Sequence, residues 1–340
     1  MTTVALFLPG WVGDVVMATP AIRALRRFFH DARIIGVLKP YVAEVVAGSD
    51  WFDAFVPLER TWATGWKLRR ERLDLAVLFP NSFRSALIAW LAGSTRQVGY
   101  RRHGRGLLLS DPLEPERYAD GTLRISPIID AYNRLAEYVG CAPPGHEMEL
   151  FTLPEDEARA EAVWDRAGLY RYPEVVLLNP GAAFGASKYW PAEYFAQLAR
   201  DLAARRQCGV LVLCGPKERE LASRIAAQAA DPAVQALSDL QVSVSLGLTK
   251  ALVRRCDLLV TTDSGPRHFA AAFDRPVVTL FGPTHIAWTE TYHPRAIHLQ
   301  KKVECGPCQQ RVCRTDHRCM KTLLPAEVLI AAEDLLHGKG

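Results

Sequence analysis

The feature that most constrains this chain is a series of short apolar segments that alternate with amphipathic helical patterns. Seven segments are expected to form strands, at residues 3–8, 33–38, 73–79, 175–179, 209–214, 257–262 and 276–281. They are apolar on both sides, as is typical of strands buried on both faces of a parallel sheet. Helical patterns occupy residues 21–29, 85–93 and 193–206. The alternation predicts an α/β, doubly wound architecture.

The pattern begins again near residue 175, after a polar helical stretch from 154 to 172. The chain has 340 residues, whereas one domain usually contains roughly 100–200. We therefore expect two Rossmann-like domains, residues 1–165 and 166–340, and a last helix at 325–337 that packs back on the first domain. Open parallel sheets bind ligands at the carboxyl ends of their strands, so the loops there are expected to carry the site.

Composition and charge exclude several classes of protein. Hydrophobic residues make up 49% and charged residues 23%, which excludes a disordered chain. The net charge of +4 argues against a protein that coats nucleic acid. No apolar run reaches the roughly 18 residues of a membrane-spanning helix, and Asp14 interrupts what would be a signal peptide. We therefore expect a cytoplasmic protein whose cysteines are mostly reduced.

The first strand-end loop reads PGWVGD over residues 9–14. Glycines allow a tight turn and a close approach to a ligand, and the next helix offers its free N–H groups. Asp14 lies in the first helical turn, where a carboxylate either stabilises the helix dipole or acts as a general base toward an incoming hydroxyl. Both interpretations stay open. The G-x-x-G-D spacing differs from the dinucleotide fingerprint, which disfavours an oxidoreductase.

The second loop reads NPGAAFGASK over residues 179–188, and it brings Lys188 to the beginning of a helix. A lysine there can neutralise a phosphate as a point charge, although most lysines are simply solvated at the surface. The small residues after a buried strand favour the phosphate-binding interpretation.

The third loop reads TTDSGPRH over residues 261–268 and opens a helix. The N–H groups of Ser264 and Gly265 at the positive helix end suit a diphosphate. The Asp263 carboxylate at the strand end can accept hydrogen bonds from sugar hydroxyls. Alternatively, Asp263 and Ser264 are simple caps and His268 is a packed helical residue. Three such loops at strand ends favour a ligand site.

A fourth loop, CGPKERE at 214–220, offers a glutamate that either binds a ribose diol or stabilises the helix dipole. The chain contains no Asp-x-Asp, in which two carboxylates hold Mg²⁺ or Mn²⁺ on a nucleotide diphosphate, and no P-loop sequence. If a diphosphate leaves here, we expect helix dipoles and Lys188 to stabilise it, with no cofactor required for catalysis.

Three segments resemble the ADP-heptose:lipopolysaccharide heptosyltransferases, which are bacterial GT-B glycosyltransferases. They are GWVGDVVMATPAIRALRR from residue 10, NPGAAFGASKYWP from residue 179 and TTDSGPRHFAAAFDRPVVTLFGPT from residue 261. The segments occur in the order typical of that family and span residues 10–284. VGYRRHGRGLLLSDPL at 98–113 also resembles the family's N-terminal domain. The chain is more similar to the heptosyltransferase II type.

The resemblance implies a GT-B fold and the inverting, metal-independent transfer of L-glycero-D-manno-heptose from ADP-heptose to a sugar hydroxyl of the lipopolysaccharide inner core. It implies that Asp14 is the base and that Lys188 offsets charge on the departing ADP. Asp263 would hold heptose hydroxyls and Glu220 the ribose, with Glu218 open as the alternative. The residues that the resemblance places at the donor are Gly13, Gly181, Glu220, Asp263, Ser264, Gly265 and His268.

Acceptor recognition is expected of the N-terminal half. Residues 60–105 contain ten Lys or Arg and two acidic residues. Arg69, Arg101 and Arg105 are the expected contacts for anionic groups of lipid A or the lipopolysaccharide core, and Trp62 and Trp66 lie near the first of these arginines. A solvated basic face is the alternative. We expect peripheral attachment to the cytoplasmic face of the inner membrane and no nucleic-acid partner.

Four cysteines near the C-terminus have the spacing C-x₂-C-x₄-C-x₅-C: Cys305, Cys308, Cys313 and Cys319. Such a set can bind zinc or an iron–sulfur cluster, form labile disulfides, or consist of bystander thiols. We favour a structural cross-link through these cysteines, either by disulfides or by a structural metal. A catalytic metal is disfavoured, because the expected reaction needs no metal.

Two other functions fit the same loops. One is a GT-B transferase that moves another sugar, such as a hexosamine, from a different nucleotide. The other is a non-catalytic protein that binds a nucleotide sugar, although the presence of both Asp14 and Lys188 argues against it.

Overall fold

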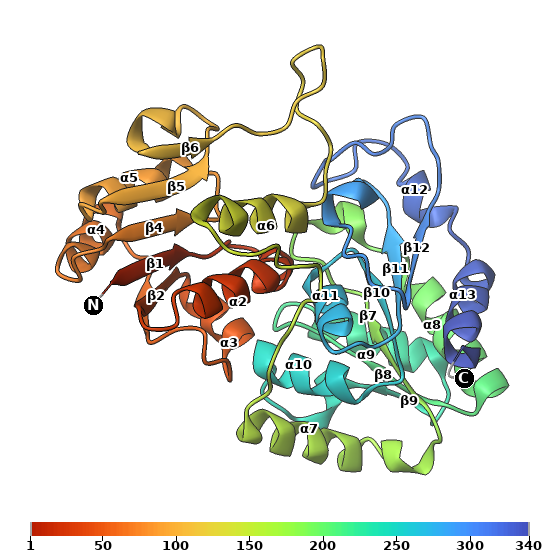
Figure 1. Ribbon diagram of the computed structural model, residues 1–340. Coiled ribbons are helices and arrows are strands. Elements are labelled where there is room, and N and C mark those ends of the chain that lie inside the picture. Colours follow the sequence, from red (N-terminus) through yellow and green to blue (C-terminus); the bar gives the residue numbers. More distant parts are fainter. Residues whose placement is uncertain (1, 339–340) are drawn as a thin grey trace. The chain divides into compact units, whose positions relative to one another are not determined.

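The computed structural model describes residues 2–338, which form two compact units (Figure 1). The first unit runs to Phe151 and includes Ala287–Thr291, and the second comprises Thr152–Ile286 and the chain from Tyr292 onward. The expected boundary at 165/166 comes at the end of helix α7 (Pro154–Arg166), which the structure assigns to the second unit. This helix packs on another helix of that unit, so the division precedes it.

The first unit is built on a six-stranded sheet in the order β3-β2-β1-β4-β5-β6, with all strand pairs parallel. Its strands are β1 (Thr3–Phe7), β2 (Arg33–Leu38), β3 (Ala54–Pro57), β4 (Leu75–Leu78), β5 (Arg96–Tyr100) and β6 (Asp111–Leu113). The central β1 is buried along its whole length, because both of its faces are covered. This is the strand order of a Rossmann fold, in which the winding reverses between β1 and β4.

Helices cover both faces of this sheet (Figure 1). They are α1 (Val12–Met17), α2 (Thr19–Phe28), α3 (Ala43–Val46), α4 (Thr61–Arg69), α5 (Phe83–Leu91) and α6 (Ile128–Val139). One core cluster joins Phe7, Val37 and Leu78 of the strands to Leu68 of α4 and Ile88 of α5. Helices α1, α2 and α6 pack on one another. The alternate strand residues, such as Val4 and Leu6, are equally buried.

The second unit repeats this arrangement with a parallel sheet in the order β12-β11-β10-β7-β8-β9. Its strands are β7 (Val175–Asn179), β8 (Gly209–Val212), β9 (Val234–Ala236), β10 (Leu258–Thr262), β11 (Val277–Phe281) and β12 (Ala296–Gln300). Here the winding reverses between β7 and β10. Both sheets therefore confirm the predicted doubly wound α/β class.

The helices of the second unit form two layers (Figure 1). Besides α7 they are α8 (Ala192–Arg206), α9 (Arg219–Ala229), α10 (Leu246–Arg255), α11 (Gly265–Ala272), α12 (Arg318–Lys321) and α13 (Pro325–His337). Helix α10 packs on α7 and α11, and α8 packs on α9. Helix α13 has the predicted bounds and contacts α8, β10 and β11. It is thus a layer of the second unit, and its packing on the first unit stays a prediction.

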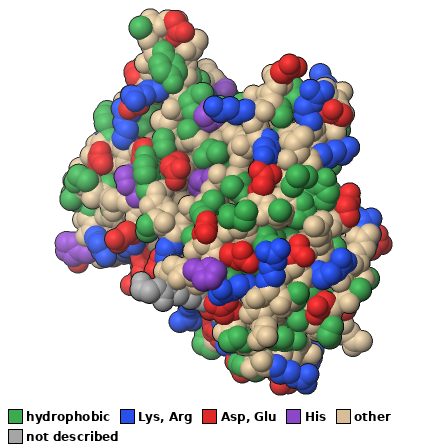
Figure 2. Space-filling model, turned by 90° about the vertical axis from the view of Figure 1, so that its right-hand side faces the viewer, with side chains coloured by type: hydrophobic (Ala, Val, Ile, Leu, Met, Phe, Trp, Pro, Cys, Tyr) green, Lys and Arg blue, Asp and Glu red, His purple; other side chains and the backbone are tan. Residues whose placement is uncertain are grey.

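No helix in the described part of the chain has the length and apolar character needed to cross a membrane. On the face shown in Figure 2, basic and acidic side chains are interspersed with apolar ones. This mixture agrees with a net charge of only +4.

Candidate functional site

The loops singled out in the sequence follow strands at which the winding of each sheet reverses. Residues 9–14 follow β1 in the first unit, and residues 180–188 and 263–264 follow β7 and β10 in the second. Open α/β sheets bind ligands in the crevice at this position. The fold therefore gives each unit one candidate half-site.

In the first unit, the loop after β1 is held by two side chains. The hydroxyl of Tyr41 donates a hydrogen bond to the carbonyl of Gly10. A Cβ at Gly10 would lie 3.1 Å from Nζ of Lys39, so glycine leaves room for that lysine. Asp14 is the third residue of the short helix α1, directly after Gly13, and it is half-buried. A carboxylate in a first turn is stabilised by the helix dipole.

The carboxylate of Asp14 lies within electrostatic range of a buried phenol. Burial raises the pKa of Tyr132 well above its ordinary value, and the negative charge of Asp14 raises it further. The Tyr132 ring also packs edge-on against Phe79, with centroids 5.3 Å apart. The negative charge of Asp14 therefore acts on a phenol that stays protonated.

Arg105 differs from its expected role as an exposed acceptor contact, because it is fully buried. Its guanidinium donates to the carbonyl of Tyr100 (2.8 Å), to Oγ of Ser85 (3.2 Å), to Oδ1 of Asn81 (3.1 Å) and to the carbonyl of Pro80. Burial, followed by the charge of Arg102, lowers its pKa to about 10, so it remains charged at neutral pH. Arg105 thus holds the loop after β4 in place.

The other two expected acceptor contacts are exposed. Arg101 pairs with Glu114 at 2.7 Å, with both side chains largely in solvent. Arg69 lies at the end of α4, where Nη1 reaches the carbonyl of Leu91 at 3.4 Å. The same helix exposes Trp62 and Trp66, at 62% and 65% of their surface. Positions 62, 66 and 69 follow helical spacing and so lie on one side of α4.

In the second unit, Asp263 lies between two cations. Lys188 Nζ is 2.5 Å from Oδ2 of Asp263 and donates to its carbonyl at 2.9 Å. Arg267 Nη1 is 3.3 Å from Oδ1 of the same carboxylate. Thr284 Oγ1 donates to Oδ2 at 2.6 Å. All four residues are buried, so the group is closed to bulk water in this structure.

The charges around Asp263 set its ionisation. Burial alone would raise its pKa, but Lys188 and Arg267 outweigh burial and lower the pKa to about 2. Both cations also contact aromatic faces. Nζ of Lys188 lies 4.8 Å from the ring centre of Phe184, and the Arg267 guanidinium lies 4.9 Å from that of Phe281. Lys188 and Arg267 therefore share the Asp263 carboxylate.

A neutral hydrogen-bond network joins the ends of β7 and β10. Nδ2 of Asn179 donates to Thr261 Oγ1 and to Ser264 Oγ, each at 2.9 Å. Thr262 Oγ1 donates to the carbonyl of Gly181 at 2.8 Å. Ser264 is the N-cap residue of α11, but its hydroxyl makes no capping hydrogen bond to the helix. Gly265 begins that helix, so the expected diphosphate loop lies beside this network.

His268 lies buried in the first turn of α11. Burial lowers its pKa well below the ordinary value, and Arg267 lowers it further, so the ring is neutral near pH 7. Among the described residues, no group forms a hydrogen bond with its Nδ1. Buried polar atoms are normally satisfied, so this unpaired nitrogen is a candidate ligand contact.

Of the two glutamates left open, Glu218 is the one that lies against the loop after β7. Its Oε2 accepts the N–H of Gly215 at 2.9 Å. Any side chain at Gly181 would collide with the Glu218 carboxylate, so the two residues are in direct contact. Glu220 is exposed in the first turn of α9. The geometry therefore favours Glu218 over the expected Glu220.

The sequence predictions missed Arg267, Thr284 and Asn179. Arg267 could have been found, because it follows Asp263 by four residues at the beginning of a helix, a spacing that brings side chains together. Thr284 is 21 residues from Asp263 and Asn179 is 82 residues from Thr261, so only the strand order brings these pairs into contact.

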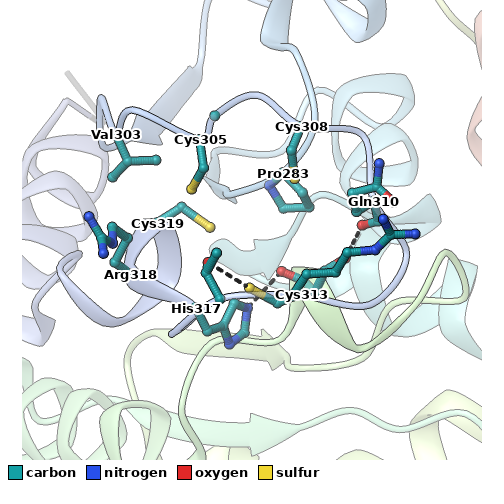
Figure 3. Close-up of a pocket in the computed structure, with 13 residues that line it drawn as sticks. Pro283, Val303, Cys305, Cys308, Gln310, Cys313, His317, Arg318 and Cys319 are labelled. Atoms are coloured by element: carbon teal, nitrogen blue, oxygen red, sulfur yellow. Dashed lines mark hydrogen bonds between the residues drawn. The ribbon is translucent and has the colours of Figure 1, made fainter.

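The four clustered cysteines lie at one cavity of the second unit, which also has lining from Pro283 and His317 (Figure 3). All four are free thiols. Cys305 and Cys308 are exposed, Cys313 is half-buried and Cys319 is buried.

The comparisons with known proteins decide the family. Residues 61–318 match the family model described as glycosyltransferase family 9 (heptosyltransferase). This chain belongs to glycosyltransferase family 9. It is 28% identical to lipopolysaccharide heptosyltransferase 2 of Salmonella typhimurium, with 98% of each chain covered, and 27% identical to lipooligosaccharide heptosyltransferase 2 of Campylobacter jejuni, with 97% of each covered.

The structure of the ADP-heptose lipopolysaccharide heptosyltransferase II of E. coli matches with a TM-score of 0.78 over 99% of both chains, at 24% identity. That likeness confirms the GT-B arrangement of two Rossmann-like units. This family 9 member is therefore a glycosyltransferase, and its two half-sites are the places to look for its substrates.

Proposed function

We propose that this family 9 enzyme transfers L-glycero-D-manno-heptose from ADP-heptose to a sugar hydroxyl of the lipopolysaccharide inner core. The names of relatives that match over nearly the whole chain support this donor and acceptor. The structural observation that carries the proposal is the buried Lys188–Asp263–Arg267 cluster at the carboxyl end of β10. A lysine and an arginine next to a helix N-terminus suit a sugar diphosphate.

The donor is held by the second unit in this proposal. The diphosphate meets the N–H groups at the beginning of α11, at Ser264 and Gly265, where the helix dipole is positive. The open Nδ1 of His268 gives the neutral ring one free hydrogen-bonding position. Gly181 keeps the loop after β7 close to Glu218, and that carboxylate binds the ribose diol.

The chemistry is a single displacement with inversion. The Asp14 carboxylate accepts the proton of the acceptor hydroxyl as its oxygen forms a bond to the anomeric carbon. The bond from that carbon to the diphosphate oxygen breaks, and ADP leaves with the electron pair. No covalent enzyme intermediate is needed, because the base and a stabilised leaving group suffice.

The leaving group is stabilised by fixed positive charge in place of a divalent cation. When a diphosphate enters, Lys188 gains a second anionic partner beside Asp263, and Arg267 keeps the carboxylate paired. Asp263 stays ionised throughout, so it accepts hydrogen bonds from heptose hydroxyls. Preorganised charges of this kind stabilise a developing anion without reorganisation during the reaction.

The acceptor is a membrane lipid, and the first unit offers a surface for it. Trp62 and Trp66 of α4 are exposed, Lys67 and Arg69 are exposed on the same helix, and Arg70 is exposed directly after it. Aromatic rings insert at a membrane interface, while basic residues are attracted to anionic headgroups. We place the enzyme peripherally on the cytoplasmic face of the inner membrane by this helix.

Donor binding by titration calorimetry tests the proposal. ADP-heptose should bind the wild-type chain, and Glu218→Gln should weaken this binding more than the matched Glu220→Gln. If a nucleotide-linked hexosamine binds more tightly than ADP-heptose, the donor is the hexosamine nucleotide and the proposed donor is wrong. Binding with no turnover on any acceptor would instead leave a nucleotide-sugar-binding protein.

A further inference from the structure

The segment between β12 and α12, residues 301–317, has no hydrophobic core of its own. It contains no helix or strand, and most of its side chains are exposed. Four cysteines from this segment and the beginning of α12 nevertheless lie around one cavity of about 120 Å³ (Figure 3). Segments too small to bury a core are usually fixed by a disulfide or a structural metal.

We propose that Cys305, Cys308, Cys313 and Cys319 bind one structural Zn²⁺ ion. Four thiolates are the donor set of closed tetrahedral zinc sites, and a C-x₂-C pair is typical of one half of such a site. Figure 3 shows sulfur atoms of this set directed into the cavity from both sides. The chemistry of the donor set therefore fits zinc.

The site requires a local closure of the segment. No group of three His, Cys, Asp or Glu side chains within residues 2–338 already has metal-ligand spacing. Cys319 is the fixed member, because it is buried beside Gly282, where an added Cβ would lie 3.3 Å from its sulfur. Cys305 and Cys308 are exposed, so their side chains can move inward without disturbing packing. Zinc binding often completes folding in this way.

The segment also contacts the loop that carries Lys188. The carbonyl of Arg311 accepts the N–H of Ser187 at 3.2 Å, and Ser187 Oγ donates to the carbonyl of Gln310 at 2.5 Å. His317 Nε2 lies 2.7 Å from the carbonyl of Ser187. Any side chain at Gly185 would collide with the Arg311 carbonyl. Residues 310–317 thus hold the residue next to Lys188 on both sides.

The zinc site is accordingly a positioning site for Lys188, a part of the inference that rests on the proposed function. Loss of the ion should loosen residues 310–317 and then the Lys188 loop. Small displacements of a positioned group can cost about a hundredfold in rate. We expect the metal-free enzyme to show a donor KM raised at least about tenfold.

Metal analysis of the full-length protein, produced with zinc present and no chelator, is the test. We expect about one zinc per chain, near zero in Cys305→Ser/Cys308→Ser, and full content in the matched control Cys141→Ala. Cobalt substitution should give the intense visible bands of a tetrahedral thiolate site in wild type and control only. Because both altered cysteines are exposed, the double variant should keep its fold, which circular dichroism checks.

Several outcomes would overturn the inference. Loss of two hydrogens per cysteine pair in the mass of the non-reduced protein would show disulfides. Iron with acid-labile sulfide would show a cluster instead of a single zinc ion. A zinc-free double variant with unchanged donor KM would overturn the positioning role alone. Zinc in a wild-type protein that transfers no heptose would contradict the proposed function and leave the metal site standing.

Discussion

The ammonium of Lys188 lies 2.5 Å from Oδ2 of Asp263, whose other oxygen lies 3.3 Å from the guanidinium of Arg267. One buried carboxylate therefore contacts two buried cations, and loss of a shared partner in such a group leaves buried charge that is costly.

Removing the Asp263 carboxylate should show how much this shared pairing stabilises the fold. In Asp263→Asn, two buried cations lose their common partner, and we expect a loss of about 3–5 kcal/mol in the free energy of unfolding. Urea unfolding measures it, with the exposed Asp274→Asn as the matched control. ADP should raise the melting temperature of Asp263→Asn more than that of wild type. A loss under about 1 kcal/mol would contradict the mutual pairing.

Asp14→Asn tests the base while keeping the shape of the side chain. The amide cannot accept the proton, so turnover should fall by about 10²–10⁴-fold. Binding of ADP-heptose should be unchanged, because Asp14 belongs to the first unit, whereas the proposed diphosphate- and ribose-binding side chains belong to the second. Steady-state kinetics with calorimetry separates the two effects. Turnover within a factor of three of wild type would remove Asp14 from the mechanism, a threshold of roughly 0.6 kcal/mol.

Acid should destabilise the enzyme in two ranges of pH. Burial lowers the folded-state pKa of His268 and of His293 below 6.5, so the unfolded chain binds these protons first. Their contribution to stability is complete above pH 6.5 and declines below it, by up to about 1.4 kcal/mol per pH unit for each histidine. For Asp263 the folded pKa is about 2, so its contribution is lost between about pH 4 and pH 2.

The variant His268→Gln should flatten the stability profile between pH 6.5 and 5, because one proton uptake on unfolding is removed. Urea unfolding at half-unit pH steps measures the slope, and the exposed His103→Gln is the control. An unchanged slope in His268→Gln would mean that this ring already titrates in the folded state.

The two exposed tryptophans of α4 should carry membrane attachment. Trp62→Ala/Trp66→Ala removes two rings from the proposed interface, and binding to anionic vesicles should fall at least about tenfold. Vesicle sedimentation measures binding, with unfolding free energy as the check on the fold. Tyr138→Ala, another exposed aromatic on a helix of the first unit, should bind as wild type does. Equal losses in both variants would argue against a specific surface.

The seven strands predicted from the sequence all exist, and each is covered by helices on both faces. The missed strands are β3, β5, β6, β9 and β12. Four of these are the edges of the two sheets, and β5 lies next to an edge. Strands at or next to an edge mix polar with apolar residues, as in RQVGY of β5 and AIHLQ of β12. Runs of apolar residues therefore predict the central strands of a parallel sheet better than the strands at or near its edges.

The candidate site was predictable where chemistry and strand ends coincide in sequence. Asp14, Lys188 and Asp263 follow apolar strands and could be singled out, whereas their partners depend on tertiary structure. Lys188 and Asp263 are 75 residues apart and meet because β7 and β10 are neighbours. Arg105 could not be predicted correctly, because a cluster of arginines in the sequence does not indicate which of them is buried.

The most direct test of the central claim is acceptor-dependent release of ADP from ADP-heptose, measured with mono-heptosylated Kdo-lipid A and without added divalent cation. The account predicts rapid release only when acceptor is present, an unchanged initial rate on adding Mg²⁺ or Mn²⁺, and loss of release in Asp14→Asn. Release that requires Mg²⁺ or Mn²⁺ would contradict stabilisation of the leaving group by Lys188 and Arg267. Absence of release from an enzyme that binds neither ADP-heptose nor ADP would contradict the proposed donor itself.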